Sequence, residues 1–128
     1  MALLGISLSA AATHKTLRVL AWPGYADADL VKIFEQRTGS HVQVTIIDSD
    51  DVLWQRVKHN KGQDFDVFAV NTAELQRYIT NKLVAPIRAD AIPNIAQQQP
   101  QFRDAERIAG LTRAGLRYAV PYTYSEMG

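Results

Sequence analysis

The 128-residue sequence has no cysteine, no long hydrophobic run and no block of like charge. The lack of cysteine excludes a thiol nucleophile, disulfides, cysteine-ligated metals and a lipid anchor on an N-terminal cysteine. The 14 lysines and arginines nearly balance the 13 aspartates and glutamates, so the formal net charge is only +1. Because these charges are interleaved, nothing in the sequence predicts nucleic acid or an anionic membrane as a partner.

Motifs of the common enzyme classes are also missing. No Gly-x-Gly-x-x-Gly or phosphate loop follows an expected strand, and there is no Gly-x-Ser-x-Gly elbow. His14, His41 and His59 lie far apart, without the spacing of metal ligands. Asp64 and Asp66 form a carboxylate pair, but their place before an expected strand favours hydrogen bonds within a turn. We therefore expect no catalytic residue, no metal and no cofactor.

The N-terminal residues predict export. The apolar run at residues 3–8 is followed by small residues at 9–12, which is the order of a signal-peptide core and its cleavage region. The run is too short to cross a bilayer, which needs about 20 apolar residues. We expect residues 1–13 to be the remnant of a secretory signal peptide, and the protein to be periplasmic. The alternative for this run is a buried strand or helix.

Expected strands and helices alternate up to about residue 83. Strands are expected at residues 17–21, 41–47 and 65–70, where β-branched and other apolar residues dominate. Within the third strand, the continuous apolar run at residues 67–70 predicts burial on both faces. A helical pattern follows each strand. The order βαβαβα predicts an α/β fold with a mainly parallel sheet and helices on both faces.

Each expected helix has boundary signals and an apolar side. Asp27 can cap the first helix and Gly39 suits its left-handed end, whereas Asn71 with Glu74 resembles a capping box for the third. The acids around Ser49 can cap the second helix. The apolar residues at helical spacing are Leu30, Val31 and Phe34 in the first helix, Val52, Leu53 and Val57 in the second, and Leu75, Tyr78 and Ile79 in the third.

The regular pattern ends beyond Leu83. Residues 91–113 are rich in Gln, Pro and Ala, which predicts a loop with short helical turns. Residues 116–120 are a possible last strand that ends at Pro121. Tyr122 and Tyr124 follow, and we interpret them as part of a core edge or of a connection to another lobe.

Candidate ligand contacts follow each strand, because ligands of open α/β sheets bind outside the carboxyl ends of the strands. Aromatic faces attract cations and carboxylates bind ammonium groups, so a cationic or amine-bearing small ligand is predicted. Each group has a structural alternative: the acids and Asn71 can simply cap helices, and Trp22 can simply pack. The candidates are Trp22 and Tyr25 after the first strand, Asp48 and Asp50 after the second, and Asn71 and Thr72 after the third.

Four segments together resemble the first lobe of the extracellular solute-binding proteins of ABC importers, and most closely the spermidine/putrescine-binding type. They are residues 17–25 (LRVLAWPGY), 33–44 (IFEQRTGSHVQV), 65–68 (FDVF) and 118–122 (YAVPY). The resemblance implies a periplasmic-binding-protein-like (type II) lobe. It also implies that residues 14–128 form the N-terminal lobe of a two-lobed protein, ending before the crossover to the second lobe. Such proteins close on their ligand by hinge motion.

The resemblance also implies a function and contact residues. The protein would capture a polyamine-like or other small amine solute for the permease of an ABC importer, would perform no chemistry, and would be a monomer at full length. Trp22 and Tyr25 match the family's ligand-facing aromatics, and Asn71 and Thr72 match a polar pair after the third strand.

Two departures from the polyamine-binding pattern leave other readings open. Pro23-Gly24 replaces a small polar residue followed by an acid, and Ala73 replaces an aromatic residue of some members. The same fold could therefore bind an organophosphonate, a thiamine-like compound or a ferric ion. An alternative from another class is a small flavodoxin-like enzyme or signalling domain.

Overall fold

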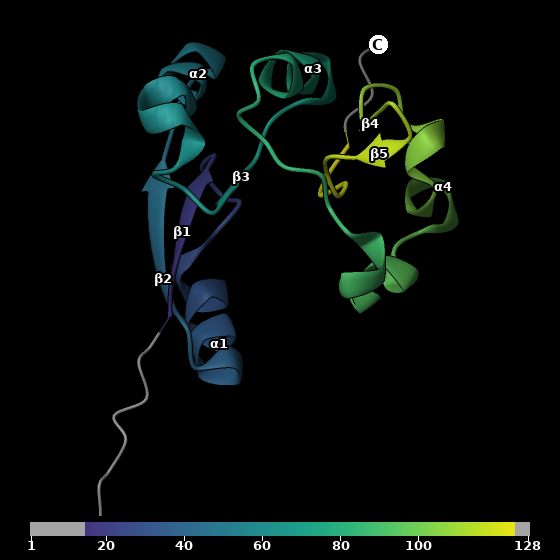
Figure 1. Ribbon diagram of the computed structural model, residues 1–128. Coiled ribbons are helices and arrows are strands. Elements are labelled where there is room, and N and C mark those ends of the chain that lie inside the picture. Colours follow the sequence, from purple (N-terminus) through teal and green to yellow (C-terminus); the bar gives the residue numbers. More distant parts are fainter. Residues whose placement is uncertain (1–14, 125–128) are drawn as a thin grey trace, which may run out of the picture.

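The computed structural model describes residues 15–124, so the expected signal-peptide remnant lies outside the described residues. Its main sheet has three parallel strands in the order β2-β1-β3 (Figure 1). The elements of this part, in chain order, are β1 (Thr16–Ala21), α1 (Ala28–Thr38), β2 (His41–Ile46), α2 (Asp50–Lys58), η1 (His59–Gly62), β3 (Val67–Phe68) and α3 (Thr72–Thr80). The predicted α/β fold and the βαβαβα order are confirmed.

The helices lie on both faces of the sheet, as predicted. Side chains of a strand alternate between its two faces. In β2, Val42 and Val44 line a hollow together with residues of α1, whereas Gln43 and Thr45 line a hollow together with residues of α2. Consequently α1 and α2 are on opposite faces.

The buried core lies on the face covered by α2 and α3. Its cluster consists of Leu20, Ile47, Leu53, Trp54, Val57 and Tyr78. The Tyr78 ring lies 5.1 Å from both the Trp54 ring, edge to face, and the Phe68 ring, measured between centroids. The predicted inner residues of α3 are all buried. In α2, Trp54 takes the buried place predicted for Val52, which is 36% exposed.

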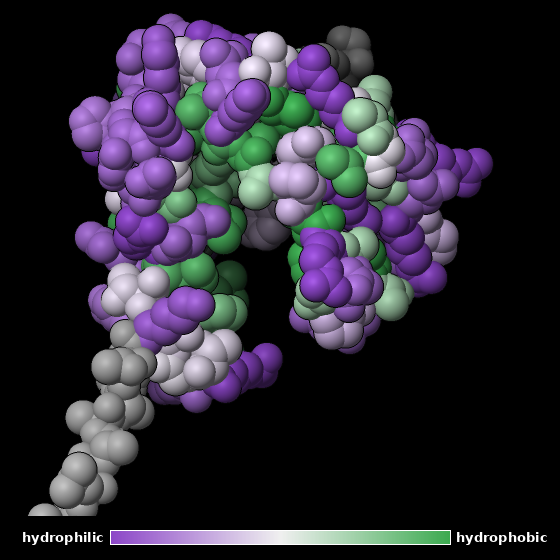
Figure 2. Space-filling view, in the orientation of Figure 1, coloured by the Kyte–Doolittle hydropathy of each residue, from purple (hydrophilic) through white to green (hydrophobic). Residues whose placement is uncertain are grey.

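The opposite face is only sparsely covered. The α1 helix forms as predicted, and Gly39 after it adopts the left-handed conformation, but no α1 residue is buried and Leu30 is 55% exposed. The predicted burial of the third strand on both faces was wrong: β3 has only two residues, and Val67 is 51% exposed because α1 lies against β2 instead. Hydrophobic residues gather along the hollow between this side of the molecule and the C-terminal region (Figure 2).

Beyond α3 the chain forms short turns and one hairpin. As predicted, residues 91–113 are mostly loop and short helical turns. These elements are η2 (Ala89–Ala91), η3 (Pro93–Gln97), α4 (Pro100–Arg103), η4 (Ala105–Arg107), β4 (Thr112–Arg113) and β5 (Leu116–Arg117). The expected last strand is shorter than predicted, and β5 pairs antiparallel with β4 outside the main sheet. This hairpin is fastened to α3, because the Gln76 side-chain amide donates to the carbonyls of Gly110 and Thr112, at 2.9 and 3.3 Å.

Within residues 15–124, none of the helices combines the length and the hydrophobicity that crossing a bilayer requires.

Candidate functional site

The carboxyl ends of the three parallel strands meet at one edge of the sheet. The Ile47 N–H, just after β2, donates to the carbonyl of Ala21 at 2.9 Å. The Ala69 N–H, just after β3, donates to the carbonyl of Leu20 at 3.2 Å. The loops that carry the candidate ligand contacts therefore start beside one another.

Trp22 is held at this edge by a hydrogen bond and by packing of its ring. The indole Nε1–H donates to the carbonyl of Ala69 at 3.0 Å, and the half-buried ring packs against the core cluster. Both a packing role and a ligand-facing role were open from the sequence. The structure shows the packing, and it ties the loop after β1 to the end of β3.

Tyr25 contacts a residue that the sequence reasoning did not include in the site. Its N–H closes a turn on the carbonyl of Trp22 at 3.1 Å, and Gly24 within that turn has a φ of 80°. The Tyr122 ring lies 4.9 Å from the Tyr25 ring, and the Tyr122 hydroxyl donates to the Tyr25 carbonyl at 3.3 Å. Tyr122 is 67% exposed and Tyr124 is also exposed, so neither belongs to the edge of a core. The only sequence signal for Tyr122 was its place in the YAVPY segment.

Asp50 and Asn71 are brought together from different loops. The Asn71 side-chain amide donates to both carboxylate oxygens of Asp50, at 3.2 and 3.3 Å. The Asn71 side-chain oxygen also accepts from the Glu74 N–H at 2.9 Å, so Asn71 caps α3 as predicted. In α2 the cap is Ser49, whose Oγ accepts from the Val52 N–H at 3.3 Å. Asp50 is thus not the capping residue, and its exposed carboxylate is held at the edge by Asn71.

Asp48 and Thr72 are at the same edge but are not joined to that pair. The Asp48 carboxylate accepts from the Ser49 hydroxyl at 3.4 Å and is exposed. Thr72 is the first residue of α3 and is also exposed. Among the described residues, no side-chain hydrogen bond links Asp48 or Thr72 to the Asp50–Asn71 pair. None links them to Trp22 or Tyr25 either.

The edge combines aromatic rings, carboxylates and one amide. Tyrosine faces attract cations, and carboxylates form charge-assisted hydrogen bonds with ammonium groups. Over residues 15–124, no group of three or more His, Cys, Asp or Glu side chains could hold a metal ion. The arrangement suits binding of a positively charged organic group.

The sequence matches one known protein family. The sequence model of the bacterial extracellular solute-binding proteins matches residues 29–128. The chain belongs to this family. The resemblance that was predicted from the sequence is thereby confirmed.

Curated relatives of this solute-binding protein include two that are named for putrescine. The chain is 26% identical over 128 residues to the putrescine-binding periplasmic protein PotF of Escherichia coli (strain K12), covering 99% of this chain and 34% of PotF. It is 24% identical over 121 residues to the putrescine-binding periplasmic protein SpuD of Pseudomonas aeruginosa (strain UCBPP-PA14), covering 94% and 32%. The chain thus spans about a third of the length of these relatives.

Solved structures share the fold. The spermidine/putrescine ABC transporter substrate-binding protein PotD from Streptococcus pneumoniae superposes with a TM-score of 0.62 at 24% identity, over 69% of this chain and 27% of that one. A Listeria monocytogenes protein, described provisionally as a spermidine/putrescine ABC transporter, gives 0.63 at 25% identity over the same shares. The predicted fold class, a lobe of the periplasmic-binding-protein type, is confirmed. These relatives are transport proteins rather than enzymes.

Proposed function

We propose that this chain is the solute-capturing part of an ABC importer, works in the periplasm, and takes up a polyamine-like or other small amine for delivery to a membrane permease. The names of the relatives support this reading. Residues 14–128 would be the N-terminal lobe of a two-lobed protein, and residues 1–13 the signal-peptide remnant. Binding, closure and docking on the permease would be its whole activity, with no chemical step.

The observation that carries the proposal is the contact between Asp50 and Asn71, at the sheet edge where the loop with Tyr25 also begins. Asp50 would bind an ammonium group by a charge-assisted hydrogen bond, and the Tyr25 face would add a cation–π contact of about 0.5–2 kcal/mol. Asn71 already holds the carboxylate at 3.2 Å, so little ordering of Asp50 is needed on binding. The hydrogen bond from the Trp22 indole to the carbonyl of Ala69 holds the loop after β1 against the end of β3. Tyr122 stacks on Tyr25 and would extend the aromatic wall.

A titration of the 128-residue chain with putrescine, followed by ¹H–¹⁵N NMR, tests the proposal. Signals of the Trp22 indole N–H and of the Tyr25 and Asn71 amides should move together as putrescine is added. We expect a Kd of about 1 mM or weaker, or about −4 kcal/mol, because one wall leaves most of the ligand in water whereas good sites bury about 70–90% of it. A micromolar one-to-one isotherm would contradict the one-lobe interpretation.

Two carboxylate variants separate specific capture from general attraction of a cation. Asp50→Asn should weaken putrescine binding several-fold, since it removes the charge that faces the ammonium group. Asp29→Asn, in the first turn of α1, removes an equal charge at another exposed place and should leave the titration unchanged. Equal effects of the two substitutions, or no movement of the Trp22 and Asn71 signals, would overturn the site assignment.

A further inference from the structure

The hollow that Gln43 and Thr45 line together with residues of α2 has a volume of about 700 Å³. Its size is within the range of about 300–1,000 Å³ that is typical of small-molecule sites. None of the candidate residues at the carboxyl edge lines it. The residues that do are Arg18 of β1, Gln43 and Thr45 of β2, Asp51, Val52, Gln55 and Arg56 of α2, and His59, Asp64 and Phe65 after that helix.

This hollow is an open groove beside the edge strand β2, on the side of the sheet where α2 lies. Gln43 and Thr45 point to the side of α2, whereas the apolar residues of β2 point to the side of α1. A sheet face beneath a helix is ordinarily apolar, because it forms the core between the two layers. The α2 side of the groove carries the exposed residues Asp51, Gln55 and Arg56, whereas the buried residues of α2 belong to the core cluster. The apolar residues that line the hollow are Val52 and Phe65.

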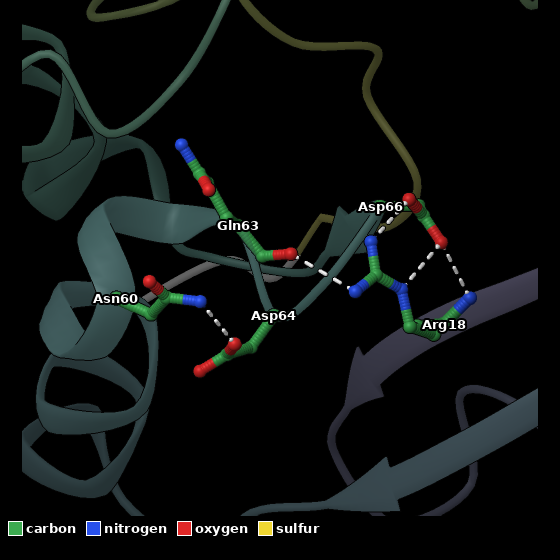
Figure 3. A network of polar contacts seen from close by, with 5 residues as sticks. All are labelled: Arg18, Asn60, Gln63, Asp64 and Asp66. Carbon is green, nitrogen blue, oxygen red and sulfur yellow. Dashed lines mark hydrogen bonds and ion pairs between the residues drawn. The ribbon is translucent and has the colours of Figure 1, made fainter.

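A network of groups whose charges are already paired borders the hollow through Arg18, His59 and Asp64, and most of it is drawn in Figure 3. The Arg18 guanidinium donates to both carboxylate oxygens of Asp66, at 2.9 and 3.1 Å, and to the carbonyl of Gln63 at 2.9 Å. The Asp64 carboxylate is bound by the Asn60 amide and by His59, both at 2.8 Å. These contacts lower the pKa of Asp64 and Asp66, so both stay ionised at neutral pH. The network therefore forms a wall and has little charge left for a ligand.

Two opposite charges in the hollow remain without a partner. Among the described residues, no hydrogen bond or ion pair involves the side chain of Asp51 or of Arg56. The two residues are five apart on α2, which separates them by about 7.5 Å along the helix axis and by about 140° around it, so they lie at the two edges of the stripe that lines the hollow. The long arginine side chain can reach back toward Asp51 across this stripe. Together they can bind a molecule that carries a carboxylate and an ammonium group a short distance apart.

We propose that this hollow is a second binding site, for a free amino acid with an uncharged side chain. Arg56 binds the carboxylate through its planar fork of donors, and Asp51 binds the ammonium group. Val52 and Phe65 contact the side chain of the ligand, and the amides of Gln43 and Gln55 border it. This site is separate from the proposed amine site at the carboxyl edge and does not depend on it.

Three probes of nearly the same shape test the proposal on the 128-residue chain. L-leucine carries both charges, L-leucinamide only the ammonium group, and 4-methylpentanoate only the carboxylate. At a pH of about 6.5 the α-amino groups of both amino compounds are protonated. L-leucine should shift the NMR signals of α2 and β2, with the Trp22 indole signal unmoved. L-leucinamide and 4-methylpentanoate should each bind about fivefold more weakly, as expected for the loss of one partly exposed charge pair.

Variants of α2 assign each charge. Arg56→Gln should abolish the advantage of L-leucine over L-leucinamide but keep its advantage over 4-methylpentanoate, and Asp51→Asn should do the reverse. Lys58→Gln removes a charge from the same helix outside the hollow and should change neither ratio. The proposal is overturned if L-leucine shifts no signal of α2, if the three probes bind equally, or if Lys58→Gln acts as Arg56→Gln does.

Discussion

The two faces of the three-stranded sheet differ in how well the chain covers them. On the side of α2 and α3, Leu20, Leu53, Val57 and Tyr78 are almost completely buried. Burial also raises the pKa of Tyr78 to about 12, so its hydroxyl stays neutral. On the side of α1, Ile46 and Val67 are about half exposed and α1 buries none of its residues. Most of the hydrophobic stabilisation of the described chain therefore comes from one face.

The candidate amine site depends on the covered face. Trp22 packs against the same cluster as α2 and α3, and Asp50 and Asn71 stand at the beginnings of these two helices. The α1 helix contributes no residue to this constellation. A substitution should therefore affect stability according to the face on which it lies, even where the residue type and the secondary structure are the same.

The largest difference is expected between two leucine-to-alanine substitutions, one in α2 and one in α1. Leu53→Ala in α2 should lower the free energy of unfolding by about 2–5 kcal/mol, because it leaves a cavity in the core. Leu30→Ala in α1 should change it by no more than about 0.5 kcal/mol, because Leu30 is largely in solvent. Urea unfolding, followed by tryptophan fluorescence, measures both values.

Both substitutions replace leucine by alanine inside a helix, so the change in helix propensity is shared and cancels in the comparison. A large loss for Leu30→Ala would mean that α1 is packed against something in solution, and the contrast between the faces would not hold. If Leu53→Ala does not fold, the milder Val57→Ala reports on the same cluster.

A second comparison concerns the attachment of the C-terminal hairpin to α3. Gly110 has a φ of 86°, and a Cβ there would lie 2.6 Å from the carbonyl oxygen of Thr72. Gly115 has a similar φ of 74°, but a Cβ there meets no atom within 4 Å. Gly115→Ala should cost about 1 kcal/mol of stability from backbone strain alone. Gly110→Ala should cost about 2–3 kcal/mol, because the hairpin must also move away from α3.

The difference between these two glycine variants isolates the close approach, since both share the strain of a left-handed alanine. In Gly110→Ala, the Gln76 side-chain amide signals should shift as their acceptors at Gly110 and Thr112 are displaced. If the two variants are equally stable, the hairpin is not held tightly against α3.

The sequence predicted the elements better than their burial. The cap at Asn71 and the stop at Gly39 are local properties, and both were confirmed. The first two strands were also confirmed, whereas the third and the last are shorter than predicted. Burial depends on what covers a face, and a pattern within one helix does not contain that information. For this reason Leu30 and Val67 were expected to behave as core residues, whereas Trp54 was missed.

The candidate site was predictable only in part, for the same reason. Parallel strands bring Trp22, Asp50 and Asn71 to one edge, and this follows from the order of elements. The Tyr25–Tyr122 contact joins residues 97 positions apart in sequence. It depends on the path of irregular chain after α3, for which no periodicity exists. The unpartnered charges of Asp51 and Arg56 could be recognised only once α2 and β2 were placed.

The smallest effect is expected for the ion pair between Arg18 and Asp66, which joins β1 to the residues just before β3. Neither residue belongs to α1 or α2. The bonds from the Arg18 side chain and backbone N–H lower the pKa of Asp66 from 3.8 to about 2. A carboxyl group whose pKa is lower in the folded state stabilises the fold above its unfolded pKa and loses this contribution as the pH falls through its folded pKa. The contribution of Asp66 is therefore complete above about pH 4 and disappears towards pH 2.

Asp66→Asn should lower the urea midpoint at neutral pH by less than either Leu53→Ala or Gly110→Ala, because the pair is partly exposed and screened. The gap between wild type and Asp66→Asn should then close between pH 4 and pH 2, whereas Asp29→Asn serves as a control without an ion pair at its position. A gap that stays constant over this pH range would show that the Asp66 carboxylate charge contributes nothing to holding β1 against β3.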